Sequence, residues 1–232
     1  MSKKLKKTVF TLNLNPDTYK EITDLKYPLI QEYCRKIDAE FYEIKTRKFS
    51  EWKSPTYEKL QIYQLGQEME NDWNIFIDAD ALVHPDMIDP TNLIPKDTVL
   101  HNGADFGLIR WKYDRFFQRD GRHIGSPSWF CIASDWCIEL FKPLDDLTQE
   151  EAYKNIFPIA GELKLGYEPW RLIEDYVMSR NIAKYGLKFK SFLDLLETNQ
   201  RAKGDYLWHN YAIPLEQKII QLKQILKNWG LT

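Results

Sequence analysis

Cysteine is scarce in this sequence, and no cysteine falls in a metal-binding pattern. Only three occur, Cys34, Cys131 and Cys137, with no spacing typical of a zinc site. This odd number argues against a disulfide scaffold, so we expect reduced, mostly buried thiols. The expected compartment is the cytoplasm, which would be that of a host cell if the source is a virus.

Long apolar runs are also missing. No window approaches the roughly 20 apolar residues that a membrane-spanning helix needs. The chain starts with the basic stretch MSKKLKK, and the apolar segment that follows, 8–14, is too short for the core of a signal peptide and lacks a small-residue cleavage site. We therefore expect neither a transmembrane segment nor a secretory leader.

An excess of positive charge is absent as well. Lys and Arg total 32 and Asp and Glu total 34, which gives a formal net charge of -2. A protein that coats nucleic acid is normally basic, so a nucleic-acid acceptor is conceivable but not favoured. Aromatic residues make up 14%, and part of this fraction suits a site that stacks on bases or sugar rings.

The first 80 residues alternate between strand and helix patterns. Short β-rich runs at 8–14, 40–46 and 73–77 flank helical spacing at 17–39, where Pro28 predicts a kink or break, and at 56–70. This order is typical of a parallel sheet built from βαβ units. Later segments predict strands and helices at 99–102, 129–133, 135–141, 173–185, 187–192 and 214–229. With 232 residues and no linker, we expect a single domain.

Two carboxylates follow the apolar strand at 73–77. Asp78 and Asp80 are separated only by Ala79, so both can point to one side of the chain. Two close carboxylates repel each other, and a divalent cation such as Mg²⁺ or Mn²⁺ removes that conflict. In α/β sheets, ligands bind beyond the carboxyl ends of the strands. The alternative is that Asp80 caps a turn while Asp78 pairs with a surface Lys or Arg.

These residues resemble the donor half of GT-A-type glycosyltransferases, whose Asp-x-Asp motif binds a metal and the donor diphosphate. The resemblance is carried by Lys59-Leu60, a helix, and the stretch 75–83. It implies a GT-A-like (Rossmann-like) α/β fold: a mixed, mostly parallel sheet flanked by helices, with a C-terminal helix. It also implies a donor-nucleotide half at about 1–100, and an acceptor half with the C-terminal helix at about 101–232.

The resemblance implies a nucleotide-diphosphate sugar, such as UDP-glucose, across the ends of the first strands. Thr11 and Asn13 match positions that meet the nucleoside, and Lys59 resembles a basic residue near the nucleotide. Asp78, Ala79 and Asp80 would hold the cation and the diphosphate.

A third metal ligand is expected far along the chain. His209 resembles the C-terminal metal-binding histidine of many GT-A enzymes. Two carboxylates, one imidazole and diphosphate oxygens favour Mn²⁺, with Mg²⁺ possible. The alternative is a core histidine packed among aromatic residues.

An acidic pair at the start of the helix at 173–185 resembles the segment that faces the sugars in GT-A enzymes. If the reaction inverts configuration, one carboxylate takes the proton of the acceptor hydroxyl. Helical neighbours point about 100° apart, so Asp175 or Glu174 fills that role, and Asp175 is preferred. The alternative is that both acids only complement the helix dipole. Trp170 and Arg171 suit stacking on a sugar and gripping a diphosphate oxygen, or packing at a lobe boundary.

Two further segments suggest looser expectations. The stretch 110–122 interleaves arginines with aromatic residues and suits a loop that closes on an anionic ligand, and Ser126-Pro127-Ser128 resembles the entry of the strand that lines the acceptor side. The C-terminal helix carries Lys218, Lys223 and Lys227 and is expected to pack on the domain, with membrane contact or a dimer seam as the alternative.

The sequence thus predicts a metal-dependent glycosyltransferase that moves a hexosyl or pentosyl group from a nucleotide-diphosphate sugar to an acceptor hydroxyl, such as that of a glycan. One alternative is a nucleotidyltransferase or another metal-dependent phosphoryl-transfer enzyme. However, the segment 13–16 contains no glycine to cradle a phosphate. The other alternative is a non-catalytic glycan- or nucleotide-binding module on the same fold. Donor, acceptor and oligomeric state are not predicted further.

Overall fold

A six-stranded mixed sheet organises the computed structural model, which describes residues 4–102, 112–113, 127–198, 203–209 and 213–231. In spatial order the strands are β2 (Glu40–Ile44), β1 (Lys7–Leu12), β3 (Trp73–Ile77), β6 (Phe130–Ser134), β5 (Thr98–His101) and β7 (Lys188–Ser191). β1 is parallel to β2 and β3, and β5 is parallel to β7. Only β6, among the described strands of this sheet, is antiparallel to its neighbours. The predicted mixed, mostly parallel sheet is confirmed.

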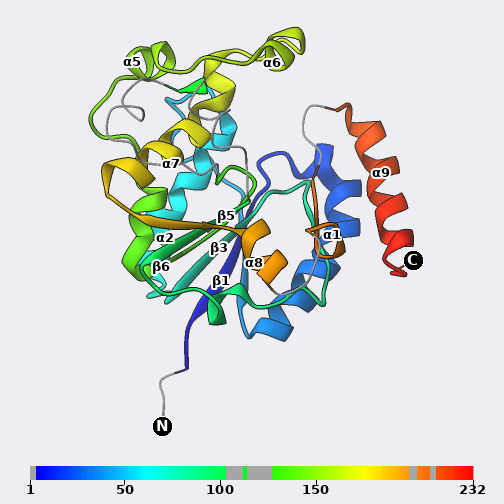
Figure 1. The fold of residues 1–232 in the computed structure, drawn as a ribbon. Helices are drawn as coiled ribbons and strands as arrows, with labels where there is room; N and C mark the ends of the chain where they lie inside the picture. Colours follow the sequence, from blue (N-terminus) through cyan, green and yellow to red (C-terminus); the bar gives the residue numbers. More distant parts are fainter. Residues whose placement is uncertain (1–3, 103–111, 114–126, 199–202, 210–212, 232) are drawn as a thin grey trace.

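Helices cover both faces of this sheet (Figure 1). One face carries α1 (Pro16–Ile37) and α8 (Phe192–Thr198), and the other carries α2 (Ile62–Glu68) and α7 (Ile173–Lys184). The C-terminal helix α9 (Leu215–Asn228) lies outside α1. The other helical segments of the described residues are the 3-10 turns at Pro55–Gln61, Pro90–Asn92, Asp135–Phe141, Pro169–Leu172 and Lys203–Asp205, with the short helices α5 (Gln149–Lys154) and α6 (Ala160–Lys164).

The alternation of side chains along β3 divides the core into two layers. All five residues of β3 are buried. Phe76 joins the apolar cluster that contains Tyr176 of α7, whereas Ile75 and Ile77 join the cluster that contains Tyr33 of α1. An apolar strand covered on both faces is the pattern expected for the centre of such a sheet.

Two helical segments differ from their sequence predictions. Helix α1 continues through Pro28, so the chain does not break there; its buried face extends on both sides of the proline, from Ile22 to Ile37. It ends at Ile37, and the residue that caps it, Asp38, has a left-handed φ of 56°. The single helix expected at 56–70 is a 3-10 segment, Pro55–Gln61, followed by the short α2.

A second, two-stranded sheet was not predicted. β4 (Leu82–Val83) pairs with β8 (Leu207–Trp208) in antiparallel register, with Leu82 opposite Trp208 and Val83 opposite Leu207. This pairing joins the residues that follow the acid pair to a segment near the end of the chain. Among the described helices, none combines the length and apolar character needed to cross a membrane.

Candidate functional site

The acid pair lies where β3 ends, at the edge of the sheet that the carboxyl ends of β1 and β2 share. The backbone N–H of Asp78 donates to the carbonyl of Trp129 at 2.9 Å, and the N–H of Ala81 donates to the carbonyl of Asp78 at 3.1 Å. These two hydrogen bonds fix the backbone of the turn that joins β3 to β4. Asp78, Ala79 and Asp80 are all partly exposed, so their side chains remain accessible.

His209 joins the acid pair because of the small β4–β8 sheet. Leu82 faces Trp208 in antiparallel register, so the residue after Trp208 meets the residues before Leu82. The Nε2 atom of His209 lies 3.2 Å from Oδ1 of Asp80. The imidazole also stacks on the Trp129 ring, with centroids 4.9 Å apart and planes inclined by 16°.

These three side chains fit a divalent cation. One ligand atom from each of Asp78, Asp80 and His209 lies within 4.8 Å of the others. Bonds of roughly 2.1 Å place two ligands of one ion about 3–4 Å apart, so small side-chain adjustments suffice. Two carboxylates and one imidazole form a donor set suited to Mn²⁺ or Mg²⁺.

A lysine from α9 completes the surroundings of Asp80. The ammonium of Lys218, which is buried on the first turn of that helix, donates to Oδ2 of Asp80. Burial opposes the ionised form of Asp80, but hydrogen bonds and charge from His209 and Lys218 outweigh it and hold the pKa of this carboxyl well below its usual range. The sequence placed Lys218 on the helix but did not predict this contact.

A second lysine stands behind Asp78. Lys26 of α1 is fully buried, and its ammonium donates to the backbone carbonyl of Asp78 and to Oγ1 of Thr11, the latter at 3.3 Å. Burial lowers the pKa of Lys26 to about 7, against the attraction of Asp78 and Asp80. Thr11, expected near the nucleoside, is fully buried beneath this lysine. Lys26 was not identified from the sequence, although it falls four residues from both Ile22 and Ile30 on the buried face of α1.

Asn13 lies directly after β1, at the same edge of the sheet. Its Nδ2 donates to Oε1 of Glu43 at 2.7 Å and to the hydroxyl of Tyr27 at 3.4 Å. The Tyr27 hydroxyl also donates to Glu43. The amide oxygen of Asn13 is buried and has no hydrogen-bond partner among the described residues. Asn13 is therefore held in place with one acceptor unused.

Lys59, predicted near the nucleotide, is fully buried between the acid pair and α7. Its ammonium donates to the carbonyl of Ser128, lies 3.6 Å from Oε1 of Glu174 and stands 4.5 Å from the centre of the Phe76 ring. Burial opposes its charge, but the carboxylates of Asp78 and Glu174 raise the pKa of Lys59 above its usual value. Lys59 thus links the end of β3 to the start of α7.

The acidic residues at the start of α7 have separate partners. Glu174 accepts a hydrogen bond from Thr56 at 2.8 Å, and burial raises its pKa despite the nearby Lys59. Asp175 accepts a hydrogen bond from the Tyr113 hydroxyl and lies 3.9 Å from the ammonium of Lys112. Both acids are more than nine-tenths buried. They belong to a polar network inside the domain rather than to an exposed helix start.

Trp170 and Arg171 lie on the 3-10 turn before α7. The Lys53 ammonium stands 4.5 Å from the Trp170 ring, and the Trp170 indole donates to Glu168. The Arg171 guanidinium lies 5.1 Å from the same ring. Apart from Lys112 and Tyr113, the arginine-rich stretch 110–122 lies outside the described residues, as does Ser126.

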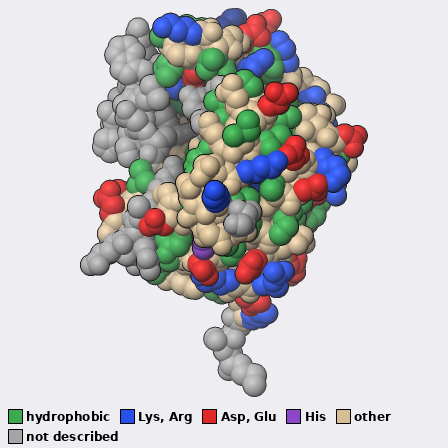
Figure 2. All heavy atoms as spheres, turned by 90° about the vertical axis from the view of Figure 1, so that its right-hand side faces the viewer, with side chains coloured by type: hydrophobic (Ala, Val, Ile, Leu, Met, Phe, Trp, Pro, Cys, Tyr) green, Lys and Arg blue, Asp and Glu red, His purple; other side chains and the backbone are tan. Residues whose placement is uncertain are grey.

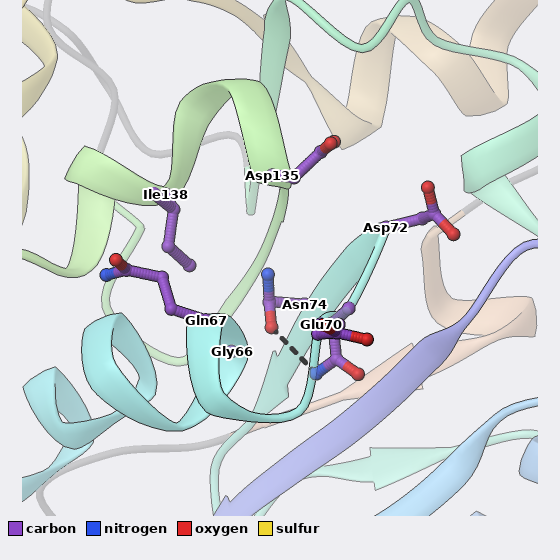
Figure 3. A pocket seen from close by; sticks show the side chains of 8 residues that line it. Gly66, Gln67, Glu70, Asp72, Asn74, Asp135 and Ile138 are labelled. Atoms are coloured by element: carbon purple, nitrogen blue, oxygen red, sulfur yellow. Dashed lines mark hydrogen bonds between the residues drawn. The ribbon is translucent and has the colours of Figure 1, made fainter.

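A separate hollow of about 430 Å³ opens at the opposite edge of the sheet, near the start of β3 (Figure 3). Gln67, Asn74 and Asp135 are among its lining residues, and it contains none of the residues predicted to form the site.

On the face shown in Figure 2, basic and acidic side chains are interspersed over the described surface, in keeping with the net charge of -2.

Comparison with known proteins supports the fold. No family model and no curated protein matches the sequence. A glycosyltransferase involved in glycosylation of the major capsid of PBCV-1 is similar in structure, with a TM-score of 0.52, 11% identity, and coverage of 94% of this chain and 98% of that chain.

Weaker likenesses include a Drosophila β-1,4-galactosyltransferase 7 with manganese, UDP-Gal and xylobiose (TM-score 0.45, 12% identity, 89% and 72% covered). Galactosyltransferase LgtC with donor and acceptor sugar analogs is another, with a TM-score of 0.44, 13% identity, and coverage of 79% of this chain and 72% of that chain. The chain has the mixed sheet and flanking helices of the GT-A glycosyltransferase fold, as the sequence predicted.

Proposed function

We propose that this protein is a metal-dependent glycosyltransferase that moves a sugar from a nucleotide-diphosphate donor to an acceptor hydroxyl, such as that of a glycan. The observation that carries the proposal is the meeting of Asp78, Asp80 and His209, whose ligand atoms lie within 4.8 Å of one another. They meet beyond the carboxyl ends of parallel strands, where α/β folds bind their ligands.

In this proposal Asp78, Asp80 and His209 hold Mn²⁺ or Mg²⁺, with the small Ala79 leaving room between the acids. A cation bound there would neutralise charge on the diphosphate as it leaves the sugar. The Trp129 ring keeps the imidazole of His209 facing the acids by stacking on it. Lys26 fixes the backbone carbonyl of Asp78 from below, so the pair is oriented before any ligand arrives.

The donor would lie along the same edge of the sheet. Asn13, held by Glu43 and Tyr27, is itself buried at the end of β1, so it would support the nucleoside side of a donor such as UDP-glucose from inside the domain. Thr11 and Lys59 are buried, so their contribution is to support this surface from inside. Trp170 and Arg171 are the proposed contacts for the sugar and the diphosphate.

The proton of the acceptor hydroxyl needs a carboxylate, and we assign it to Asp175, with Glu174 as its neighbour. Tyr113 donates to Asp175 and thereby fixes the orientation of this carboxylate. Glu174 is engaged by Thr56 and lies beside Lys59. The charges of Glu174 and of Asp78 both raise the pKa of Lys59, so this buried lysine lies between the start of α7 and the proposed metal ligand Asp78 in electrostatic terms.

The proposal is tested by calorimetry and donor turnover with a panel of nucleotide-sugars. The parent should bind one donor in the presence of Mn²⁺ and slowly hydrolyse it, and Asp80→Ala should do neither. Asp97→Ala serves as a control, because Asp97 is an acid on the surface that pairs with Lys188. Retention of Mn²⁺ and donor binding in Asp80→Ala would overturn the assignment. A parent without nucleotide affinity, with or without Mn²⁺, would point instead to a binding module.

A further inference from the structure

Lys218 occupies a position that a cation at the acid pair would contest. Its ammonium donates to Oδ2 of Asp80, while Oδ1 of the same carboxylate lies 3.2 Å from Nε2 of His209. Both oxygens of Asp80 therefore already face nitrogen atoms, and one of these carries a full positive charge. The side chain of Lys218 is only 9% exposed, so water screens this contact weakly.

The position of Lys218 is fixed by the packing of α9. Leu222 and Leu226 of that helix form an apolar cluster with Ile22 of α1 and with Leu82, which follows the acid pair in β4. Lys218 lies one turn before Leu222 on the same face of α9, so its side chain is also directed towards α1 and the chain next to the acid pair. Its contact with Asp80 therefore follows from the docking of the helix.

We propose that Lys218 is an internal counterion of the acid pair and that a divalent cation must displace its ammonium from Asp80. In the cation-free protein, the ammonium offsets the repulsion between Asp78 and Asp80. A doubly charged ion between Asp78, Asp80 and His209 repels the ammonium and competes for the same carboxylate. Lys218 thus sets the cation affinity of the site. This inference rests on the proposed function, since it takes these three residues as the metal ligands.

Within the described part of the chain, the lysines Lys26, Lys59 and Lys223 do not compete in this way. Lys26 donates to the backbone carbonyl of Asp78 and to Thr11, and Lys59 donates to the carbonyl of Ser128. Lys223 lies further along α9 and pairs at the surface with Glu21 at 2.7 Å. Lys223→Met removes the same charge from the same helix without touching the acid pair, so it is a matched control for Lys218→Met.

The test is a calorimetric titration of Mn²⁺ into the parent, Lys218→Met, Lys218→Arg and Lys223→Met. Loss of a charge-assisted hydrogen bond that competes with the ion should tighten Mn²⁺ binding of Lys218→Met by about tenfold or more. Lys218→Arg keeps the charge and should stay near the parent, as should Lys223→Met. Equal or weaker Mn²⁺ binding by Lys218→Met, with normal binding by the parent, would overturn this inference alone. Absence of Mn²⁺ binding in the parent would overturn the proposed function as well.

Thermal unfolding distinguishes a counterion role of Lys218 from a purely structural role. With a chelator present, Lys218→Met should melt below the parent, because the two acids have lost their counterion. With saturating Mn²⁺ the difference should shrink or reverse, since the ion binds the variant more tightly and replaces the missing charge. An equal loss of melting temperature in both conditions would mean that Lys218 only anchors α9, and the inference would fail.

Discussion

The Nε2 atom of His209 lies 3.2 Å from Oδ1 of Asp80, although the two residues are far apart in the sequence. The contact depends on a very small element, the two-residue pairing of β4 with β8. The antiparallel register carries the chain from Trp208 straight to the acids that precede Leu82. A short pairing thus completes a site that begins at the end of β3.

His209 should be a metal ligand, whereas the nearby His84 should not. We expect His209→Gln to weaken Mn²⁺ binding by at least about tenfold, because the site loses its only imidazole among the described ligands. His84 accepts a hydrogen bond from the N–H of Asp86 and packs against Trp229, so His84→Gln is the matched control. Calorimetry compares the two. Equal Mn²⁺ affinities in both variants would remove His209 from the site.

The buried pair of Lys59 and Glu174 should be strongly coupled in stability. Lys59→Met leaves Glu174 without its cation in the interior and should cost about 3–5 kcal/mol of unfolding free energy. The double variant Lys59→Met with Glu174→Gln should recover part of that loss, with a coupling energy of about 1–3 kcal/mol. Denaturant unfolding of the parent, both single variants and the double variant measures this cycle. Additive losses would show that the two side chains do not interact.

Several of these relationships could be predicted from the sequence and others could not. The apolar strand at 73–77 and the two acids after it form a strong local pattern, so β3 and the acid pair were identified. β4 and β8 are too short to show any periodicity, so the route that brings His209 to Asp80 is visible only in the structure. The same limit applies to Lys218, because a helix pattern shows which face is apolar but not which carboxylate a lysine will meet.

The two acids of α7 should differ in their effect on turnover. Asp175→Asn removes the proposed base and should lower the turnover number by about 10²–10⁴-fold with little change in donor affinity. Glu174→Gln should have a smaller effect on turnover and should act mainly through the stability of the Lys59 network. Steady-state kinetics of the two variants, with donor affinity measured separately, distinguishes them. A larger loss of turnover in Glu174→Gln would exchange the two assignments.

His101 should make the protein less stable in acid. Burial lowers the pKa of this histidine to about 4, so it stays neutral in the folded protein while the unfolded chain binds a proton near the ordinary value of 6.5. Stability is therefore full above pH 6.5 and falls as the pH drops towards 4, by up to about 3 kcal/mol. His101→Phe should flatten this part of the curve. Urea unfolding at pH 7.5 and 4.5 tests it, and identical pH dependence in both proteins would contradict the assignment.

The most direct test of the proposed function is the dependence of nucleotide binding on the cation at Asp80. Calorimetry should show that the parent binds UDP, or the diphosphate of its own donor, much more tightly with Mn²⁺ than with a chelator. In Asp80→Asn this gain should disappear, while Asp97→Asn should keep it. Equal gains from Mn²⁺ in the parent and in Asp80→Asn would show that the acid pair does not join a metal to the diphosphate.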